Sequence, residues 1–144
     1  MRQLDTLLKF EKDKESQAAQ KLQKAEQEYQ QNISRLKGVS DYRLEYMKRL
    51  SQRSIEGIDS ATYTHYHAFI AKLDHASEQV HIAMVQAKAL SEQCKTFWMK
   101  QRQKVQAVEH LRGKQLKKAA LITQNNDQKM FDEIANQQFI RRRR

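Results

Sequence analysis

Apolar residues recur along this chain at alternating intervals of four and three residues. Starting from Leu4, these steps reach a set that is mostly apolar or aromatic: Leu4, Leu8, Glu11, Glu15, Ala18, Leu22, Ala25, Tyr29, Asn32, Leu36, Val39, Arg43, Tyr46 and Leu50. This spacing is the heptad repeat of a coiled coil, whose a and d positions form an apolar seam between helices. It predicts a helix over about residues 3–53, with polar interruptions at Glu11, Glu15 and Arg43.

A second periodic segment predicts another helix over about residues 61–138. Its seam first runs through Tyr66, Phe69, Leu73, Ala76, Val80, Ala83, Ala87, Leu90, Cys94, Phe97 and Gln101. The pattern then slips by one residue and resumes at Val105, Val108, Leu111, Gln115, Ala119, Ile122 and Asn126. We interpret this slip as a stutter, which changes the supercoil locally. A last apolar set consists of Met130, Ile134, Phe139 and Ile140.

Only one stretch between these helices has the composition of a turn. Residues 54–60 include Gly57, with Asp59 and Ser60 as N-cap residues for the second helix. The chain has no Pro and only three Gly, and good helix formers dominate it. We therefore predict an all-α fold: a long antiparallel two-helix coiled-coil hairpin, forming a single domain over residues 1–144. Paired residue numbers should sum to about 112, so that the second helix overhangs beyond about residue 111 and ends in a basic tail at 139–144.

The net charge of +10 is concentrated in the last third of the chain. Residues 1–94 carry 14 Lys and Arg against 13 Asp and Glu, whereas residues 95–144 carry 13 against 4. Such a field favours an acidic protein surface, nucleic acid or anionic lipid. The tail Arg141–Arg144 is too short to specify a ligand, and the absence of interleaved aromatic residues in the overhang argues against nucleic acid.

No pattern of catalytic or metal-binding residues is evident in the sequence. The five His do not form an HxxxH or HExxH pair, and no Gly-rich phosphate loop occurs. Cys94 falls on the seam, where a small apolar side chain is expected. We therefore predict no enzyme activity, no cofactor and no small-molecule substrate. The single cysteine and the lack of an apolar run of about 18–20 residues favour a soluble intracellular protein.

More aromatic residues lie near the predicted turn than a two-helix seam buries. They include Tyr42, Tyr46, Tyr63, Tyr66 and Phe69. Exposed aromatic clusters commonly mark partner sites, which favours docking here, although a local cap cluster is the alternative. At the other end, Leu7, Leu8 and Phe10 are expected opposite Phe97, Trp98 and Met99, as a thick core or as a binding face.

Three segments, in which residues outside the seam also match, resemble the flagellar FliJ family of the type III protein export apparatus. They are DYRLEYMKRL (Asp41–Leu50), YHAFIAKLDHASEQ (Tyr66–Gln79) and DQKMFDEIA (Asp127–Ala135). The resemblance implies an antiparallel coiled coil similar to the γ stalk of rotary ATPases. It also implies three kinds of partner: the hexameric export ATPase, the linker of the membrane export-gate protein, and export chaperones. The implied location is cytoplasmic, peripherally at the inner membrane of the flagellar base.

The resemblance also implies two sets of binding residues. The export-gate surface of the family corresponds to Tyr42, Tyr46, Phe69, Leu73 and Ala76, flanked by Arg35, Val39 and Val80. The ATPase-facing end corresponds to the region of the two termini, with Leu4, Leu7, Phe10, Trp98, Lys114, Lys117 and Lys118 as candidates. Two alternatives remain open at this stage. They are a basic coiled coil that binds nucleic acid, and a rotary-ATPase stalk, which would normally also carry a globular domain.

Overall fold

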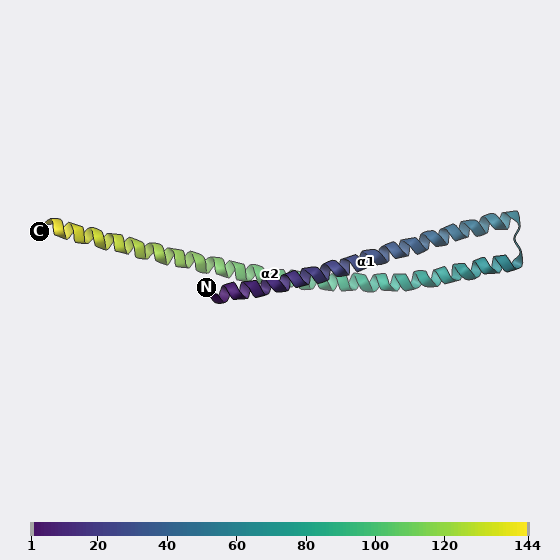
Figure 1. Cartoon of the computed structure of the whole chain (residues 1–144), viewed down its shortest axis with the longest axis horizontal. Coiled ribbons are helices and arrows are strands. Elements are labelled where there is room, and N and C mark those ends of the chain that lie inside the picture. Colours follow the sequence, from purple (N-terminus) through teal and green to yellow (C-terminus); the bar gives the residue numbers. More distant parts are fainter. Residues whose placement is uncertain (1, 144) are drawn as a thin grey trace. The chain divides into compact units, whose positions relative to one another are not determined.

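The computed structural model describes residues 2–143 as two long α-helices that pack against each other as an antiparallel hairpin (Figure 1). Helix α1 spans Arg2–Glu56 and helix α2 spans Ser60–Arg143, and residues 2–143 contain no strand. The predicted all-α hairpin is confirmed. The second helix was predicted to end at about residue 138, whereas α2 continues through Arg141 and Arg142 to Arg143. Arg144 of the predicted tail lies outside the described residues.

The chain divides into two compact units, which we describe separately. The turn unit is Ser16–Met99, and the terminal unit combines the residues up to Glu15 with those from Lys100 onward. The interpretation of residues 1–144 as a single domain stays a prediction.

Burial along α1 follows the predicted heptad seam. Every seam residue from Leu4 to Leu50 is buried or half-buried, and elsewhere in α1 only Ala19 and Ile33 are not exposed. The most buried seam residues are Leu8, Ala18, Ala25, Asn32 and Leu50. A single stripe of this width is what a two-stranded coiled coil buries.

Burial along α2 follows the predicted seam as far as Ala87. The observed seam then continues through Ser91, Cys94, Trp98, Gln101, Val105, Val108 and Arg112, of which Cys94, Gln101, Val105 and Val108 were predicted. The predicted seam residues Leu90, Phe97 and Leu111 are 47%, 60% and 47% exposed, so their placement in the seam was wrong. In a straight α-helix, residues spaced seven apart shift around the helix axis by about 20° per heptad. Two successive four-residue steps bring the stripe of seam residues back toward the partner helix. The slip predicted after Gln101 therefore occurs already after Ala87.

The turn between the helices is short and is stabilised by local backbone features. Gly57 has a φ of 98°, which a residue without a Cβ adopts readily just after a helix. Asp59 caps α2, because its Oδ1 accepts a hydrogen bond from the Thr62 N–H at 3.2 Å. The predicted N-cap role of Asp59 is therefore confirmed. Hydrogen bonding to Thr62 lowers the pKa of the Asp59 carboxyl.

This cap predicts a pH dependence of stability. The lowered pKa means that the Asp59 carboxylate stabilises the fold fully above its unfolded pKa of about 3.9. That contribution is lost as the pH falls through the lower folded value. Asp59→Asn keeps a capping side chain without the charge, so its melting temperature should fall less than that of the parent chain between neutral pH and pH 2.5.

Circular dichroism melts of both chains across this pH range measure the effect. Asp41→Asn, at an exposed position inside α1, controls for the general loss of one negative charge. Parallel pH profiles for the parent chain and Asp59→Asn would contradict the assignment of Asp59 as an ionised cap.

Candidate protein-docking surfaces

An aromatic cluster joins the two helices near the turn in the turn unit. Tyr46 lies at its centre, with ring centroids 4.4 Å from Phe69, 5.6 Å from Tyr66 and 5.3 Å from Tyr42. Tyr42 and Phe69 meet edge to face at 6.0 Å. We call these four residues the turn-end cluster. Tilted and edge-to-face pairs are favourable geometries for aromatic rings. These contacts restrict the orientations of the rings in the unbound chain.

The turn-end cluster contains three of the five residues predicted for the export-gate surface. Of these, Tyr42 is 44% exposed, whereas Tyr46 and Phe69 are half-buried. The other two, Leu73 and Ala76, are half-buried further along α2. Of the predicted flanking residues, Arg35 is exposed, whereas Val39 and Val80 are half-buried. The structure thus brings the three aromatic residues into contact and leaves one of them open to solvent.

Cationic side chains border the turn-end cluster. The Arg49 guanidinium lies 5.8 Å from the Tyr46 ring centroid, and that of Arg53 lies 5.8 Å from the Tyr66 centroid. Arg43 forms an ion pair across the helices with Asp74. The surface near the turn therefore combines apolar rings with positive charge, a composition that is common in protein interfaces.

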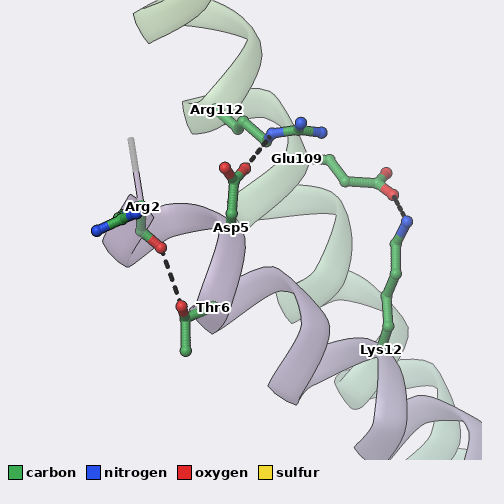
Figure 2. A network of polar contacts seen from close by, with 6 residues as sticks. All are labelled: Arg2, Asp5, Thr6, Lys12, Glu109 and Arg112. Atoms are coloured by element: carbon green, nitrogen blue, oxygen red, sulfur yellow. Dashed lines mark hydrogen bonds and ion pairs between the residues drawn. The ribbon is translucent and has the colours of Figure 1, made fainter.

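In the terminal unit, polar contacts pair the start of α1 with α2 (Figure 2). Arg112 Nε lies 2.7 Å from Asp5 Oδ1, and Lys12 Nζ lies 3.4 Å from Glu109 Oε1. Deeper in the seam, the buried Gln101 amide donates a hydrogen bond to the Glu11 carbonyl oxygen at 3.0 Å and also contacts the Glu11 carboxylate. The exposed pairs each contribute only about 0–1 kcal/mol, so they orient the helices more than they stabilise them.

Beyond Gly113, helix α2 is exposed on all sides through Arg143. We call residues 114–143 the terminal segment. It exposes many large apolar side chains: Leu116, Leu121, Ile122, Met130, Phe131, Ile134, Phe139 and Ile140. Their exposure ranges from 42% at Leu116 to 72% at Phe131. The predicted overhang is confirmed for these residues. Exposed apolar residues in such number commonly mark an interaction surface.

The residues predicted for the ATPase-facing end differ in how accessible they are. Leu7 and Phe10 are 40% and 53% exposed, and Lys14 Nζ lies 4.5 Å from the Phe10 ring centroid. The three predicted lysines are all exposed on the terminal segment: Lys114, Lys117 and Lys118. Leu4 is half-buried at a seam position. Trp98 is also half-buried on the seam, and it belongs to the turn unit rather than to the terminal unit.

Sequence reasoning missed Leu116, Leu121 and Phe131 as exposed apolar residues. None of these three residues falls on the seam predicted for α2. This departure from the heptad spacing could have shown from the sequence that they are exposed. The seam positions nearest to them, such as Gln115 and Asn126, are polar, which is unfavourable for a continued coiled coil. These three residues leave the heptad spacing, and α1 covers none of them.

Residues 2–143 contain no group of three His, Cys, Asp or Glu that could hold a metal ion. Cys94 is half-buried on the seam of α2, as its spacing predicted. No helix in the described part of the chain is long and apolar enough to cross a membrane.

The fold is a coiled-coil hairpin with exposed aromatic and apolar surfaces, and surfaces of this composition commonly bind other proteins. A family model described as "Flagellar FliJ protein" matches residues 1–144, so the chain belongs to the FliJ family. Membership makes it a flagellar protein and a component of flagellar protein export.

Two relatives with the same description resemble the chain over most of its length. The "Flagellar FliJ protein" of Salmonella typhi is 30% identical over 139 residues, which cover 96% of this chain and 95% of the relative. The "Flagellar FliJ protein" of Escherichia coli (strain K12) is 30% identical over 113 residues, which cover 78% of this chain and 77% of the relative. No solved structure matches the chain significantly.

Proposed function

We propose that this chain couples the hexameric flagellar export ATPase to the membrane export gate and escorts export chaperones, without catalysing a reaction itself. It would act in the cytoplasm, peripherally at the inner membrane of the flagellar base. The observation that supports this proposal most directly is the presence of a different docking surface in each unit. The turn unit carries the turn-end cluster, and the terminal unit carries the basic, apolar terminal segment.

The export gate would bind the turn-end cluster together with Leu73 and Ala76. Because the rings already contact one another, little side-chain entropy is lost when a partner covers them. Tyr is also enriched among the residues that dominate binding energies in interfaces. An exposed Tyr42 beside the half-buried Phe69 would then provide a small apolar anchor at this end of the hairpin.

The ATPase would bind the terminal unit through Leu7, Phe10 and the terminal segment. The 12 Lys and Arg of residues 100–144 would steer this unit toward an acidic surface, and the exposed apolar side chains would then be buried. Every residue of the terminal segment is exposed, so binding would also stabilise its helical conformation. Chaperone escort is proposed from family membership alone.

The combined substitution Tyr42→Ala and Phe69→Ala tests the gate surface. Removing both rings should weaken binding to the purified cytoplasmic part of the gate protein by about tenfold or more, since each lost anchor costs above 1 kcal/mol. Isothermal titration calorimetry with the full-length chain measures the affinity. Circular dichroism verifies that the variant is still folded.

A matched control is the pair Leu44→Ala and Tyr63→Ala. These residues are 56% and 45% exposed near the same turn but lie outside the predicted gate surface. The control pair should bind the gate normally. If the first variant remains folded and binds as tightly as the parent chain, the turn-end cluster is not the gate surface.

A further inference from the structure

The start of α1 buries little apolar surface in the terminal unit. Its four seam residues there are Leu4, Leu8, Glu11 and Glu15, so half of them carry a carboxylate. Of these four, Leu8 is buried and the other three are half-buried. Most of the stability of a helix in a folded protein comes from the packing of its apolar face, so this stretch is held weakly.

The stretch of α2 that belongs to the same unit is equally polar. Its seam residues are Gln101, Val105, Val108 and Arg112. The buried Gln101 amide bonds to Glu11, and Arg112 forms an ion pair with Asp5. When the two helices separate, water replaces such polar contacts, so their net contribution to the closed state is small.

The boundary of the terminal unit falls beside these polar seam residues. The division lies between Glu15 and Ser16 on α1 and between Met99 and Lys100 on α2. Cooperative local opening commonly follows structural units of this kind. Isolated helices shorter than about 12–15 residues are marginal in water, so residues 2–15 lose most of their helical structure when they separate from α2.

The seam face of α2 continues in line into the terminal segment. At about 100° per residue, an arc of about 80° contains Val105 and Val108 together with Leu116, Met130 and Ile134. The last three residues are 42%, 62% and 45% exposed, whereas Val105 is buried and Val108 is half-buried. Polar residues interrupt this arc. The covered apolar residues nevertheless lie on the same side of α2 as these exposed residues of the terminal segment.

We infer that residues 2–15 of α1 form a strap that opens locally and uncovers Val105 and Val108. The turn unit stays closed while the strap opens. Opening lengthens the exposed apolar surface of the terminal segment back toward residue 105. The inference concerns the free chain, so it does not depend on the partners proposed above.

Thiol labelling of the full-length chain tests the strap. Cys94→Ser removes the native thiol, and Val105→Cys then places a thiol at a seam position that is 4% exposed. N-ethylmaleimide reaches this thiol only when the strap opens, so the labelling rate reports local opening. Ala25→Cys in the same background is the matched control, since Ala25 is 5% exposed on the seam of the turn unit. Val105→Cys should react at least about tenfold faster than Ala25→Cys.

The combined substitution Glu11→Leu and Gln101→Leu tests the cause of the opening. An apolar pair in place of the polar one should stabilise the closed strap and slow the labelling of Val105→Cys at least about tenfold. The labelling rate of Ala25→Cys should stay the same. Asn32→Leu also replaces a buried polar seam residue, but in the turn unit, and should leave the labelling of Val105→Cys unchanged.

Equal labelling rates of Val105→Cys and Ala25→Cys would mean that the chain opens only as a whole, which overturns the inference. An unchanged rate after Glu11→Leu and Gln101→Leu overturns it as well. Hydrogen exchange of the parent chain gives a second readout that needs no new cysteine. Relative to an unfolded chain, amides of residues 5–15 should exchange at least about tenfold faster than those of residues 20–40. Equal protection of these two ranges would likewise contradict the strap.

Discussion

Replacing Ala18 with aspartate is expected to unfold the turn unit near room temperature. Ala18 is only 2% exposed on the α1 seam, so the new carboxylate would be enclosed by the facing helix. Leaving a buried charge without a partner costs about 3–5 kcal/mol, which is a large fraction of the stability of an ordinary domain. The turn unit consists of two helices and has no second core to compensate, because each layer of the seam contacts only its neighbours.

Circular dichroism at 222 nm with thermal melting measures this loss. Gln20→Asp is the matched control, because it adds the same charge and the same poor helix former at an exposed position of the same helix. The control should lower the melting temperature by only a few degrees. If Ala18→Asp and Gln20→Asp lowered the melting temperature by similar amounts, the assignment of Ala18 to the buried seam of α1 would be contradicted.

The seam of α1 could be predicted from the sequence because its heptad spacing is unbroken. Even the polar positions Glu11, Glu15, Asn32 and Arg43 are buried or half-buried as the spacing requires. Once the neighbouring seam residues pack against α2, the geometry of the helix determines which side chain of α1 faces α2. This holds whether that side chain is polar or apolar. Asn32 illustrates this, since it is 5% exposed and its amide donates a hydrogen bond to the Glu28 carbonyl of its own helix.

The seam of α2 could not be located fully from the sequence because two stripes compete after Ala87. One contains Leu90 and Phe97, and the other contains Ser91 and Trp98. Hydrophobicity favours the first stripe, but the structure buries the second more deeply. Which stripe is buried depends on the angular drift that accumulates along the helix and on contact with α1. Counting heptad intervals along α2 alone takes neither into account.

The candidate docking surfaces were predictable only in part. The excess of aromatic residues near the turn was visible in the sequence, but their mutual contacts and the exposure of Tyr42 required the folded pair of helices. Trp98 was assigned to the ATPase-facing end by its position in the chain, whereas the structure places it on the seam of the turn unit. The assignment of these residues to the ATPase-facing end stays a prediction, and its exposed members are Leu7, Phe10 and the lysines of the terminal segment.

Ending the chain after Gly113 is expected to abolish binding to the export ATPase while leaving the hairpin stable. Every residue of the terminal segment is exposed, so its removal deletes almost no buried apolar area. The melting temperature should change by no more than about 3 °C, in line with the small effects of changes at exposed sites. The deletion also removes eight large exposed apolar side chains, Lys114, Lys117 and Lys118. Because several anchors are lost together, affinity for the purified ATPase should fall at least about a hundredfold.

Surface plasmon resonance at several salt concentrations separates the apolar from the electrostatic contribution to this loss. The full-length control Lys114→Gln, Lys117→Gln and Lys118→Gln keeps the apolar side chains and removes only charge. It should slow association and flatten the salt dependence, with a smaller loss of affinity than the truncated chain. ATPase binding by the truncated chain at the parent affinity would exclude the terminal segment as the docking surface. A fall of about 10 °C or more in its melting temperature would mean that the segment stabilises the hairpin, which its exposure contradicts.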